Sequence, residues 1–551
     1  MDKNNYPLPQ QLFAKHAQTM PNQVFLRQPV NRVYKEFTWK ETYDSCLKLA
    51  SGYRNLGLEP GDKICILSKN VAEWFIADFA AMLAGLICAP IYPTAGEKTI
   101  AYVIDHSEAK AIVVGKLDSS EPTSAALKGK SIITIAMPYE SIDCDHSMED
   151  LIAANEPLQE VATPALDDVA SLAYTSGSTG NPKGAVLTFR NIAYGSLVLA
   201  NTLESTPDDR VLSYLPLAHI MERISVEYQS LYAGFTVTFL ESLETFAEDL
   251  QNCEPTSFVT VPRLWMKFQM GVLAKIPQKK LDRLLKIPII SGIVKNKIKK
   301  SLGFSNVRFY ATGSAPISSI TLEWFRKIGI DISEAWGMTE TSCVSVVNFP
   351  FNKAKIGTIG KPVDGTEIKI SEQGEILVKS DGVIKEYYKE PNKTAEAFRD
   401  GWLHTGDKGE IDADGFIRIT GRVKDIFKSG KGKYVVPVPI ESLLFENTII
   451  EQVCVMGSGL PQPVAAVVLA EEVSTGLSNN EIEQSLDDTL IHVNERLEGH
   501  EKLDRIIVTK EPWSIENGLL TPTLKIKRSE LEDKYQETIS IESRDKVVWQ
   551  E

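Results

Sequence analysis

A glycine-rich run with one lysine is the segment whose residue types are best suited to chemistry. It extends from Tyr174 to Gly184 and combines hydroxyl side chains, glycines and a single cation. Glycines let the backbone come close to a ligand, and backbone N–H groups with a cation balance phosphate charge. The residues that we expect to contact a polyphosphate are Thr175, Ser176, Gly177, Ser178, Thr179, Gly180 and Lys183. The run is not a Walker loop, because glycine follows the lysine where that loop has Ser or Thr. An ordinary surface turn is the alternative.

Six further motifs follow in order along the chain. They are Leu215–Ile220, Ala311–Pro316, Trp336–Thr341, Gly401–Asp407, Gly421–Asp425 and Asn517–Lys525. Together with the glycine-rich run, the set resembles the AMP-forming acyl-CoA synthetases, and among them the long-chain fatty acid–CoA ligase branch of the adenylate-forming enzymes. The resemblance covers nearly the whole chain.

The resemblance implies a reaction in two steps. A fatty acid carboxylate attacks the α-phosphate of ATP, which releases pyrophosphate and leaves an acyl adenylate. The thiol of coenzyme A then displaces AMP and gives acyl-CoA. ATP, Mg²⁺ and coenzyme A are thus the implied cofactors and co-substrates. Such a site must balance phosphate charge, hold the carboxylate in line with the leaving pyrophosphate, and exclude water from a reactive anhydride.

The resemblance assigns the phosphates and the metal to two of the motifs. The run from Thr175 to Lys183 would hold the β- and γ-phosphates, and Thr339 would bind the α-phosphate. Glu340 would hold Mg²⁺, a hard cation that prefers carboxylate and phosphate oxygens.

The nucleoside would lie among four motifs. Trp336, followed by Gly337, would offer a flat face to adenine where the family usually has tyrosine. Asp407 would accept hydrogen bonds from both ribose hydroxyls, with Arg422 assisting, although a plain turn residue is the alternative for Asp407. The other side of the adenine slot would be formed by Gly313, Ser314 and Ala315.

Two residues would act at the reacting carboxylate. His219 matches a family position at the acyl pocket, so we expect it to position the substrate and not to transfer a proton; a satisfied core histidine is the alternative. Lys525 would stabilise the charge that develops between carboxylate and α-phosphate. The family usually has glycine before this lysine, and here Leu524 stands there, which keeps Lys527 as the neighbouring candidate. Arg263 also matches a family pattern, and a structural ion pair explains it equally well.

The resemblance also implies a change of conformation. Lys424 occupies the family's hinge position, about which the C-terminal domain would rotate. The coenzyme A channel would then be lined by Lys428, Gly430, Lys431, Gly432 and Lys433. Lysines there favour an anionic ligand.

The elements that must position these residues alternate between strand and helix patterns. Apolar runs such as Lys63–Ser68 and Ala111–Val114 are typical of buried parallel strands in an α/β protein with helices on both faces of its sheets. We expect an N-terminal domain over 1–423, with two mainly parallel α/β sheets and a small β-barrel-like module at about 356–421. A small mobile α+β domain over 424–551 would follow.

Composition limits the function classes. The net charge of −14 argues against a general nucleic-acid binder. Seven scattered cysteines, with no CxxC pair, favour reduced thiols in the cytoplasm. The segment Trp74–Tyr92 carries Asp78 and Pro90, so we expect a buried helix and strand there and not a membrane span.

One stretch departs from the acidic character of the chain. Residues 275–300 contain many lysines, interleaved with apolar residues, and a single acid, Asp282. This pattern favours peripheral contact with the inner face of a membrane and, equally, a surface helical hairpin with solvated lysines. A homodimer is a further expectation.

The leading hypothesis is an AMP-forming long-chain fatty acid–CoA ligase. The alternatives are an aryl-CoA ligase, a fatty acyl-AMP ligase with another acceptor, and a non-catalytic relative that binds nucleotide or acyl chains. The binding-protein alternative is the weakest, because the loop, the acids and the late lysine are all present.

Overall fold

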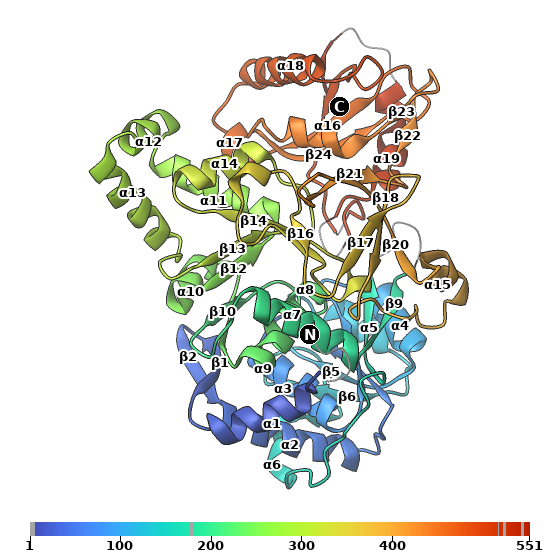
Figure 1. Ribbon diagram of the computed structural model, residues 1–551. Helices are drawn as coiled ribbons and strands as arrows, with labels where there is room; N and C mark the ends of the chain where they lie inside the picture. The colour runs from blue at the N-terminus through green and yellow to red at the C-terminus, as the bar shows by residue number, and fades with distance from the viewer. Residues whose placement is uncertain (1–5, 176–180, 516, 522–524, 541–544, 551) are drawn as a thin grey trace.

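The structure is a computed structural model, which describes residues 6–175, 181–515, 517–521, 525–540 and 545–550. A large N-terminal lobe carries a smaller C-terminal lobe above it (Figure 1). The expected α/β architecture with a C-terminal α+β domain is confirmed. Within the described ranges, no helix is long and apolar enough to cross a bilayer.

The largest sheet has seven strands and holds the glycine-rich run at one edge. Alternate residues of β3 point to opposite faces, with Ile64 and Ile66 in one core and Cys65 and Leu67 in another, so both faces are buried. Helices α2 (Trp39–Asn55), α3 (Ala72–Leu83) and α7 (Phe189–Thr202) belong to the first core, and α4 (Glu97–Ser107) and α5 (Glu121–Leu127) to the second. All neighbouring strands are parallel except β8 and β9. In sheet order they are β7 (His146–Ser147), β6 (Ile133–Ala136), β5 (Ala109–Val114), β3 (Lys63–Leu67), β4 (Ile87–Ile91), β8 (Val169–Thr175) and β9 (Lys183–Thr188).

Two further sheets complete the α/β part of the large lobe. The first has the order β10 (Arg210–Ser213), β11 (Thr236–Phe239), β1 (Val24–Val30) and β2 (Val33–Thr38). The second has the order β12 (Ser257–Thr260), β13 (Phe309–Thr312), β14 (Ile332–Trp336), β15 (Val346–Val347) and β16 (Lys361–Pro362). Trp265 of α11 (Pro262–Lys275) and Phe325 of α14 (Ser319–Lys327) pack in the core beside the second sheet.

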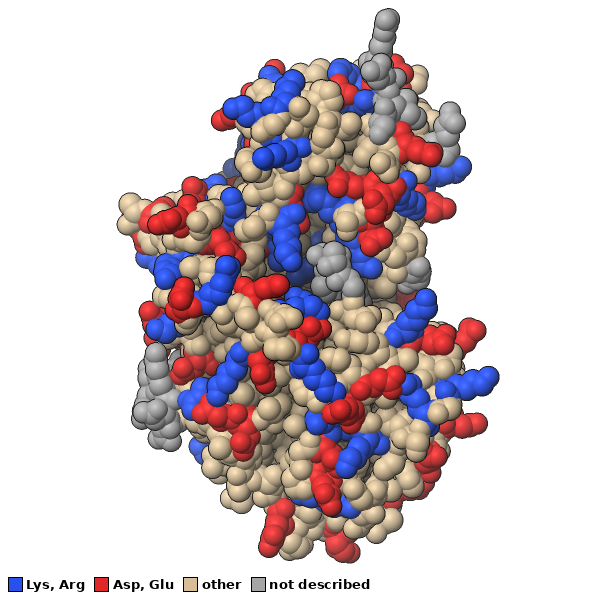
Figure 2. Space-filling model, turned by 90° about the vertical axis from the view of Figure 1, so that its right-hand side faces the viewer, with Lys and Arg blue, Asp and Glu red and all other residues tan. Residues whose placement is uncertain are grey.

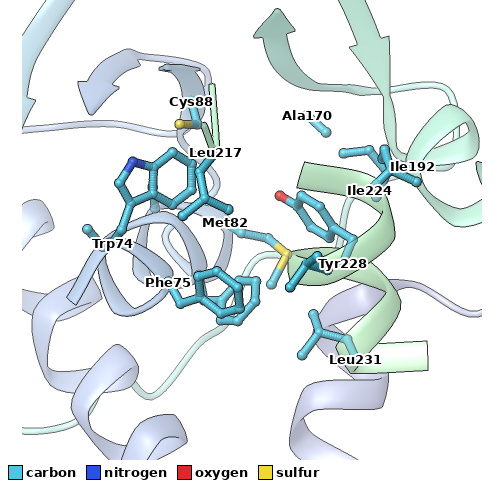
Figure 3. Close-up of a cluster of buried hydrophobic side chains, with 14 of the residues drawn as sticks. Trp74, Phe75, Met82, Cys88, Ala170, Ile192, Leu217, Ile224, Tyr228 and Leu231 are labelled. Atoms are coloured by element: carbon cyan, nitrogen blue, oxygen red, sulfur yellow. The ribbon is translucent and has the colours of Figure 1, made fainter. Parts of the chain in front are cut away.

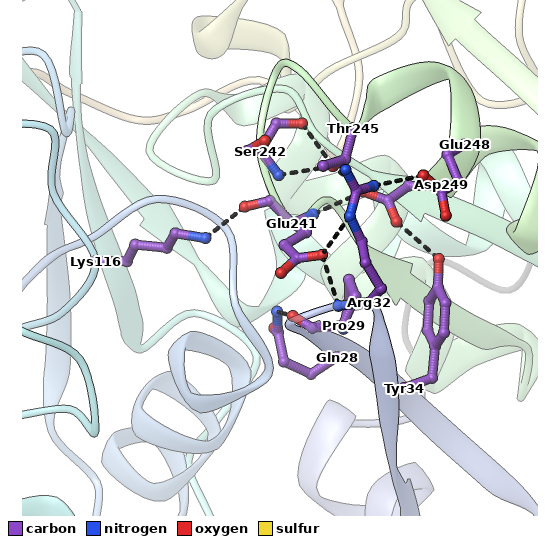
Figure 4. A network of polar contacts seen from close by, with 10 residues as sticks. All are labelled: Gln28, Pro29, Arg32, Tyr34, Lys116, Glu241, Ser242, Thr245, Glu248 and Asp249. Carbon is purple, nitrogen blue, oxygen red and sulfur yellow. Dashed lines mark hydrogen bonds and ion pairs between the residues drawn. The ribbon is translucent and has the colours of Figure 1, made fainter.

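Polar contacts join the β1–β2 hairpin to α10 (Phe246–Cys253) and to the segment between β11 and α10 (Figure 4). Arg32 donates its backbone N–H to Glu241 at 3.2 Å and its Nη1 to Glu248 at 2.6 Å. Tyr34 donates to Asp249 at 2.7 Å, and Lys116 of the large-sheet region donates to the Glu241 carbonyl. The network therefore links the four-stranded sheet, which contains β1 and β2, to the region of the seven-stranded sheet.

A five-stranded antiparallel sheet links the lobes. Its order is β17 (Glu367–Ile370), β18 (Glu375–Lys379), β20 (Trp402–Ile411) and β19 (Phe398–Arg399), with β21 (Ile417–Arg422) on β20. Ile376, Val378 and Ile417 share a core with Trp336 and Val346 of the preceding sheet, so the two sheets pack on one another.

The small lobe is built on a mixed sheet with an apolar core on each face. The sheet order is β24 (Ile450–Met456), β25 (Val464–Leu469), β26 (Ile506–Val508) and β27 (Val547–Trp549). The short hairpin β22 (Phe427–Lys428) and β23 (Tyr434–Val435) precedes it. The helices are α16 (Pro437–Leu444), α17 (Glu471–Ser474), α18 (Asn479–Glu495) and α19 (Arg528–Ser540).

Candidate active site

The glycine-rich run joins β8 to the edge strand β9. Thr175 ends β8 directly opposite Lys183, which begins β9. Residues 176–180, and with them the expected contacts of Ser176, Gly177, Ser178, Thr179 and Gly180, lie outside the described residues. The hairpin therefore places the one lysine of the run at the base of the loop.

Lys183 lies against an aromatic residue that sequence reasoning missed. Its Nζ is 4.9 Å from the centre of the Tyr387 ring. The Tyr387 hydroxyl donates a hydrogen bond to Glu340 Oε1 at 2.6 Å, so one tyrosine contacts both the lysine and the expected metal ligand. Withdrawal from water, followed by the charge of Lys424, lowers the pKa of Lys183. Tyr387 reaches this place through a backbone bridge to Ala185, a long-range contact that leaves no local pattern.

Glu340 and Thr339 occupy a short 3-10 turn, Thr339–Thr341, just after β14. The backbone carbonyl of Glu340 accepts from the N–H of Ile384, which fixes this turn beside the segment of Tyr387. A Cβ on Gly337 would lie 1.5 Å from the carbonyl oxygen of Cys343, so glycine is required for the chain to pack here.

Asp407 is held by two donors from different sheets. The antiparallel pairing of β20 and β21 sets it opposite Arg422, whose Nε donates to Oδ1 at 2.7 Å. Trp336, at the end of β14, donates its indole Nε1–H to Oδ2 at 2.9 Å. Asp407 raises the pKa of Arg422. Trp336 is only 9% exposed, and it packs on the shared core.

The Gly313–Ala315 segment follows β13, the parallel neighbour of β14. Gly313 and Trp336 therefore lie at the carboxyl ends of adjacent strands, the usual place for a ligand in a parallel sheet. A Cβ on Gly313 would lie 3.2 Å from the Ala335 carbonyl oxygen. Ser314 has φ of +68° and is exposed, as is Ala315.

His219 caps α8 (Ile220–Glu222), and its Nδ1 accepts the backbone N–H of Met221 at 3.3 Å. Burial, followed by the charge of Lys525, lowers the pKa of His219 to about 4, so the ring is neutral at pH 7. The histidine thus lies at the start of a helix and faces a charge from the other lobe.

The helix that follows His219 is anchored in the main core. Ile224 and Tyr228 of the π-helix Arg223–Tyr228 lie in the same cluster as Trp74, Phe75 and Met82 of α3 (Figure 3). The side chain of Arg223, 1% exposed, lies over the rings of Trp74 and Tyr228 and forms an ion pair with Asp78 at 2.9 Å. A buried charge is retained only when it is paired, so this contact fixes the helix and with it the position of His219.

Lys525 comes to the site from the small lobe. Its side chain keeps exposed surface, yet withdrawal from water and then the charge of Arg422 lower the pKa of its ammonium, while Asp407 and Glu340 raise it. Among the described residues, the structure therefore brings Lys183, His219, Glu340, Asp407, Arg422 and Lys525 into one region. Figure 2 shows a hollow between the lobes in which Lys and Arg side chains gather.

An apolar pocket adjoins the His219 segment, where the resemblance implied an acyl pocket, and its lining residues were not predicted. It encloses about 740 Å³ of space, part of it open to solvent. Its walls include Met221, Ala311 and Ala335, which are close in sequence to His219, Gly313 and Trp336. Glu222 also lines it, and burial raises the pKa of that carboxyl to about 8. Others among its lining residues are Leu199, Val211, Phe258, Phe309 and Val347.

The expected hinge and coenzyme A residues lie beyond β21. Lys424 is exposed in the turn between β21 and β22. The described contacts of the β22–β23 hairpin include small-lobe residues 457–460, and they do not bring it to Asp407. This hairpin carries Lys428, Gly430, Lys431, Gly432 and Lys433.

Comparison with known proteins agrees with this arrangement. The AMP-binding enzyme family matches residues 13–388, and the AMP-binding enzyme C-terminal domain matches residues 424–542. Long-chain-fatty-acid–CoA ligase 5 of Rattus norvegicus is 32% identical, over 92% of this chain and 84% of its own length. Long-chain-fatty-acid–CoA ligase FadD15 of Mycobacterium tuberculosis is 29% identical, over 95% and 94%.

Solved structures show the same fold. The anthranilate CoA ligase AuaEII in complex with anthranoyl-AMP superposes with a TM-score of 0.81 at 21% identity, over 97% of this chain and 98% of that one. The o-succinylbenzoate coenzyme A synthetase of Bacillus subtilis, in complex with ATP and magnesium ion, gives 0.73 at 25% identity, over 95% and 99%. The chain therefore belongs to the AMP-binding enzyme family and, within it, to the group of the long-chain-fatty-acid–CoA ligases.

Proposed function

We propose that the protein activates a fatty acid with ATP, releasing pyrophosphate, and transfers the acyl group to coenzyme A. The observation that carries the proposal is the apolar pocket beside His219, whose walls adjoin the strand ends that carry Gly313 and Trp336. A hydrocarbon chain suits this pocket because its lining is mostly apolar, with Glu222 among its few polar residues. The carboxylate would then lie beside the nucleotide.

The nucleotide would extend from the Asp407 cluster towards the glycine-rich hairpin. Asp407 and Arg422 would hold the ribose, and Thr339 the α-phosphate. Lys183 would balance the charge of the outer phosphates, since its ammonium stands at the base of the loop.

Mg²⁺ would be held by Glu340 together with phosphate oxygens. Among the residues that the structure describes, no cluster of three His, Cys, Asp or Glu side chains could hold a metal alone. Mg²⁺ in nucleotide enzymes commonly uses one or two carboxylates plus substrate phosphates, so a single glutamate fits. Bound there, the cation would neutralise phosphate charge.

The reacting carboxylate would lie between His219 and Lys525. A fatty acid is already ionised at neutral pH, so no proton needs to be removed from it, and a neutral His219 can only position it. Attack on the α-phosphate concentrates negative charge between the two groups, and the Lys525 ammonium would stabilise that charge.

Thioester formation would use a rotation of the small lobe about Lys424. The boundary between the N-terminal domain, 1–423, and the C-terminal domain, 424–551, would lie at this residue. A turn between two strands is suited to absorb such a change of φ and ψ. The β22–β23 hairpin, with its exposed lysines, would then meet the anionic coenzyme A.

The protein would work in the cytoplasm, at the membrane surface considered below. Its seven cysteines are free thiols, and all except Cys144 are buried, which suits a reducing compartment. A homodimer is a further proposal that sedimentation equilibrium would test.

The test is pyrophosphate release from Mg-ATP with a panel of carboxylic acids, with and without coenzyme A. Release that depends on a fatty acid, with acyl-CoA formed once coenzyme A is added, is the expected result. Release with aromatic acids only, or without acyl-CoA, would identify an aryl ligase or another acceptor. No release with any acid would overturn the proposal. The Lys525→Ala variant should lose adenylate formation, whereas the matched Lys527→Ala variant should keep it.

A further inference from the structure

The helical hairpin of α12 (Gln278–Leu285) and α13 (Pro288–Ser301) stands out from the large lobe as an arm on the left of Figure 1. Its tip exposes four isoleucines within seven residues. We call these residues the hairpin tip: Ile287, Ile289, Ile290 and Ile293, which are 47%, 81%, 37% and 62% exposed. Single exposed apolar residues are ordinary, whereas a contiguous group indicates an interaction surface.

The hairpin does not need its tip in order to fold. Leu281 and Ile298 are buried in the core of the large lobe, and Leu285 and Val294 pack against that core. The interleaved apolar residues seen in the sequence therefore serve mainly as an inner face. The tip isoleucines take no part in that core contact and remain exposed.

Positively charged residues flank this tip along both helices. Residues 279–300 hold eight cations and one acid, Asp282, in a protein of net charge −14. Asp282 accepts a hydrogen bond from Gln278 at 2.8 Å. None of the eight cations forms an ion pair with any residue in the described part of the chain. They are Lys279, Lys280, Arg283, Lys286, Lys295, Lys297, Lys299 and Lys300.

The spacing on α13 arranges the apolar and charged residues in sequence along one face. Ile289, Ile293 and Lys297 are separated by four residues each, and Lys300 follows Lys297 by three, so all lie on the same side of the helix. Lys297 stands about 6 Å further along the axis than Ile293. On this face of α13 the isoleucines therefore lie nearest the tip of the hairpin, and the lysines lie further from it.

We propose that the hairpin tip inserts into the interface of an anionic phospholipid bilayer while the lysines behind it contact lipid phosphates. An anionic bilayer has apolar acyl chains beneath a layer of negatively charged headgroups. An apolar tip with unpaired cations behind it is complementary to that arrangement. This proposal rests on the proposed function in one respect: the bilayer would supply the fatty acid, because fatty acids partition into bilayers. The contacts that support it do not depend on the ligase reaction.

Co-sedimentation with vesicles tests the proposal. The full-length protein is mixed with vesicles of phosphatidylcholine alone and with vesicles that also contain phosphatidylglycerol. We expect binding to the anionic vesicles only. The double variant Ile289→Ser/Ile293→Ser and the double variant Lys297→Glu/Lys300→Glu should each reduce binding about tenfold or more, since burial and charge both contribute.

Matched variants on the small lobe control for general effects of polarity and charge. Ile491→Ser replaces an isoleucine that is 53% exposed on α18, and Lys502→Glu/Lys510→Glu makes the same change of net charge. Both should bind like the wild type. No binding by the wild type, or equal losses in the controls, would overturn the proposal. Loss in the lysine variant alone would overturn insertion of the tip.

Activity with a water-soluble acid separates this proposal from the ligase. Every hairpin variant should keep that activity and its melting temperature, because α12 and α13 lie far in the fold from β9 and β20, the strands that carry Lys183 and Asp407 (Figure 1). An inactive wild type that still binds vesicles would count against the ligase and leave the docking surface in place.

Discussion

The indole of Trp336 donates a hydrogen bond to the carboxylate of Asp407 at 2.9 Å. The sequence suggested Trp336 as a flat face for adenine and Asp407 as a ribose ligand, with no link between them. The bond joins the end of a parallel strand to an antiparallel strand far along the chain. It orients one oxygen of Asp407, while Arg422 orients the other.

Replacing Trp336 by phenylalanine should therefore weaken nucleotide binding. A hydrogen bond to a charged acceptor contributes about 1.5–3 kcal/mol, so the KM for ATP should rise about tenfold or more. The matched control is Trp324→Phe, which removes a different indole donor, the one to Gln278 of α12. Steady-state kinetics at saturating fatty acid measures the effect. An unchanged KM in Trp336→Phe would show that the indole does not position Asp407 for the nucleotide.

Removing the hydroxyl of Tyr387 should raise the magnesium requirement. Tyr387→Phe keeps the ring over Lys183 and deletes the donor to Glu340 Oε1. Loss of a partner that orients a metal ligand typically costs about 10–100-fold in affinity. The measurement is pyrophosphate release against Mg²⁺ concentration at fixed ATP. Tyr388→Phe, which loses a hydroxyl contact to Glu108 at 3.2 Å, should keep the wild-type curve.

Acid should destabilise the protein in part through His219. Burial holds the folded-state pKa of His219 at about 4, below an unfolded value of about 6.5, so the unfolded chain binds the proton more tightly. The stabilisation is complete above the unfolded pKa and falls as pH decreases towards 4. Between about pH 7.5 and 5 the loss is about 2 kcal/mol.

Thermal melting of His219→Gln at these two pH values tests whether His219 destabilises the protein on acidification. The variant should lose less stability on acidification than the wild type. His492→Gln, which changes a histidine with a 61% exposed side chain in the small lobe, should follow the wild type. An equal acid sensitivity in His219→Gln and the wild type would contradict the assignment.

The sequence predicted the elements better than their contacts. Buried runs such as Lys63–Ser68 correspond closely to observed strands, because both faces of the sheet require apolar residues. The grouping of Asp407, Arg422 and Lys525 followed from motif order and resemblance, and the structure brings these residues to one place.

What the sequence could not indicate depends on long-range packing. Tyr387 meets Glu340 only because its segment bridges to β9, and no local periodicity marks that contact. The apolar pocket is lined by segments from α7 to β15, so its volume is a property of tertiary packing. On the basic hairpin, the sequence pattern does not distinguish Leu281 from Ile289. Only the structure shows that Leu281 is buried in the core and that Ile289 is exposed.

The two lobes are joined by an ion pair between Arg263 of α11 and Glu451 of β24. The sequence left Arg263 open between a family role and a structural ion pair, and the structure has the ion pair. In the same arrangement the charges of Asp407 and Glu340 act on Lys525, so the ion pair stabilises the arrangement that we propose for adenylate formation.

Glu451→Gln and Lys424→Pro should consequently have opposite effects on the two half-reactions. Weakening the ion pair should slow pyrophosphate release a few-fold, since a partly exposed pair contributes roughly 1 kcal/mol or less, and spare thioester formation from supplied acyl adenylate. Proline at 424 fixes φ, so it should spare pyrophosphate release and cripple thioester formation. The charge exchange Arg263→Glu/Glu451→Arg should restore the first rate. Parallel losses of both half-reactions in both variants would mean that neither residue controls a rotation, because a shared loss reports damage to the common site.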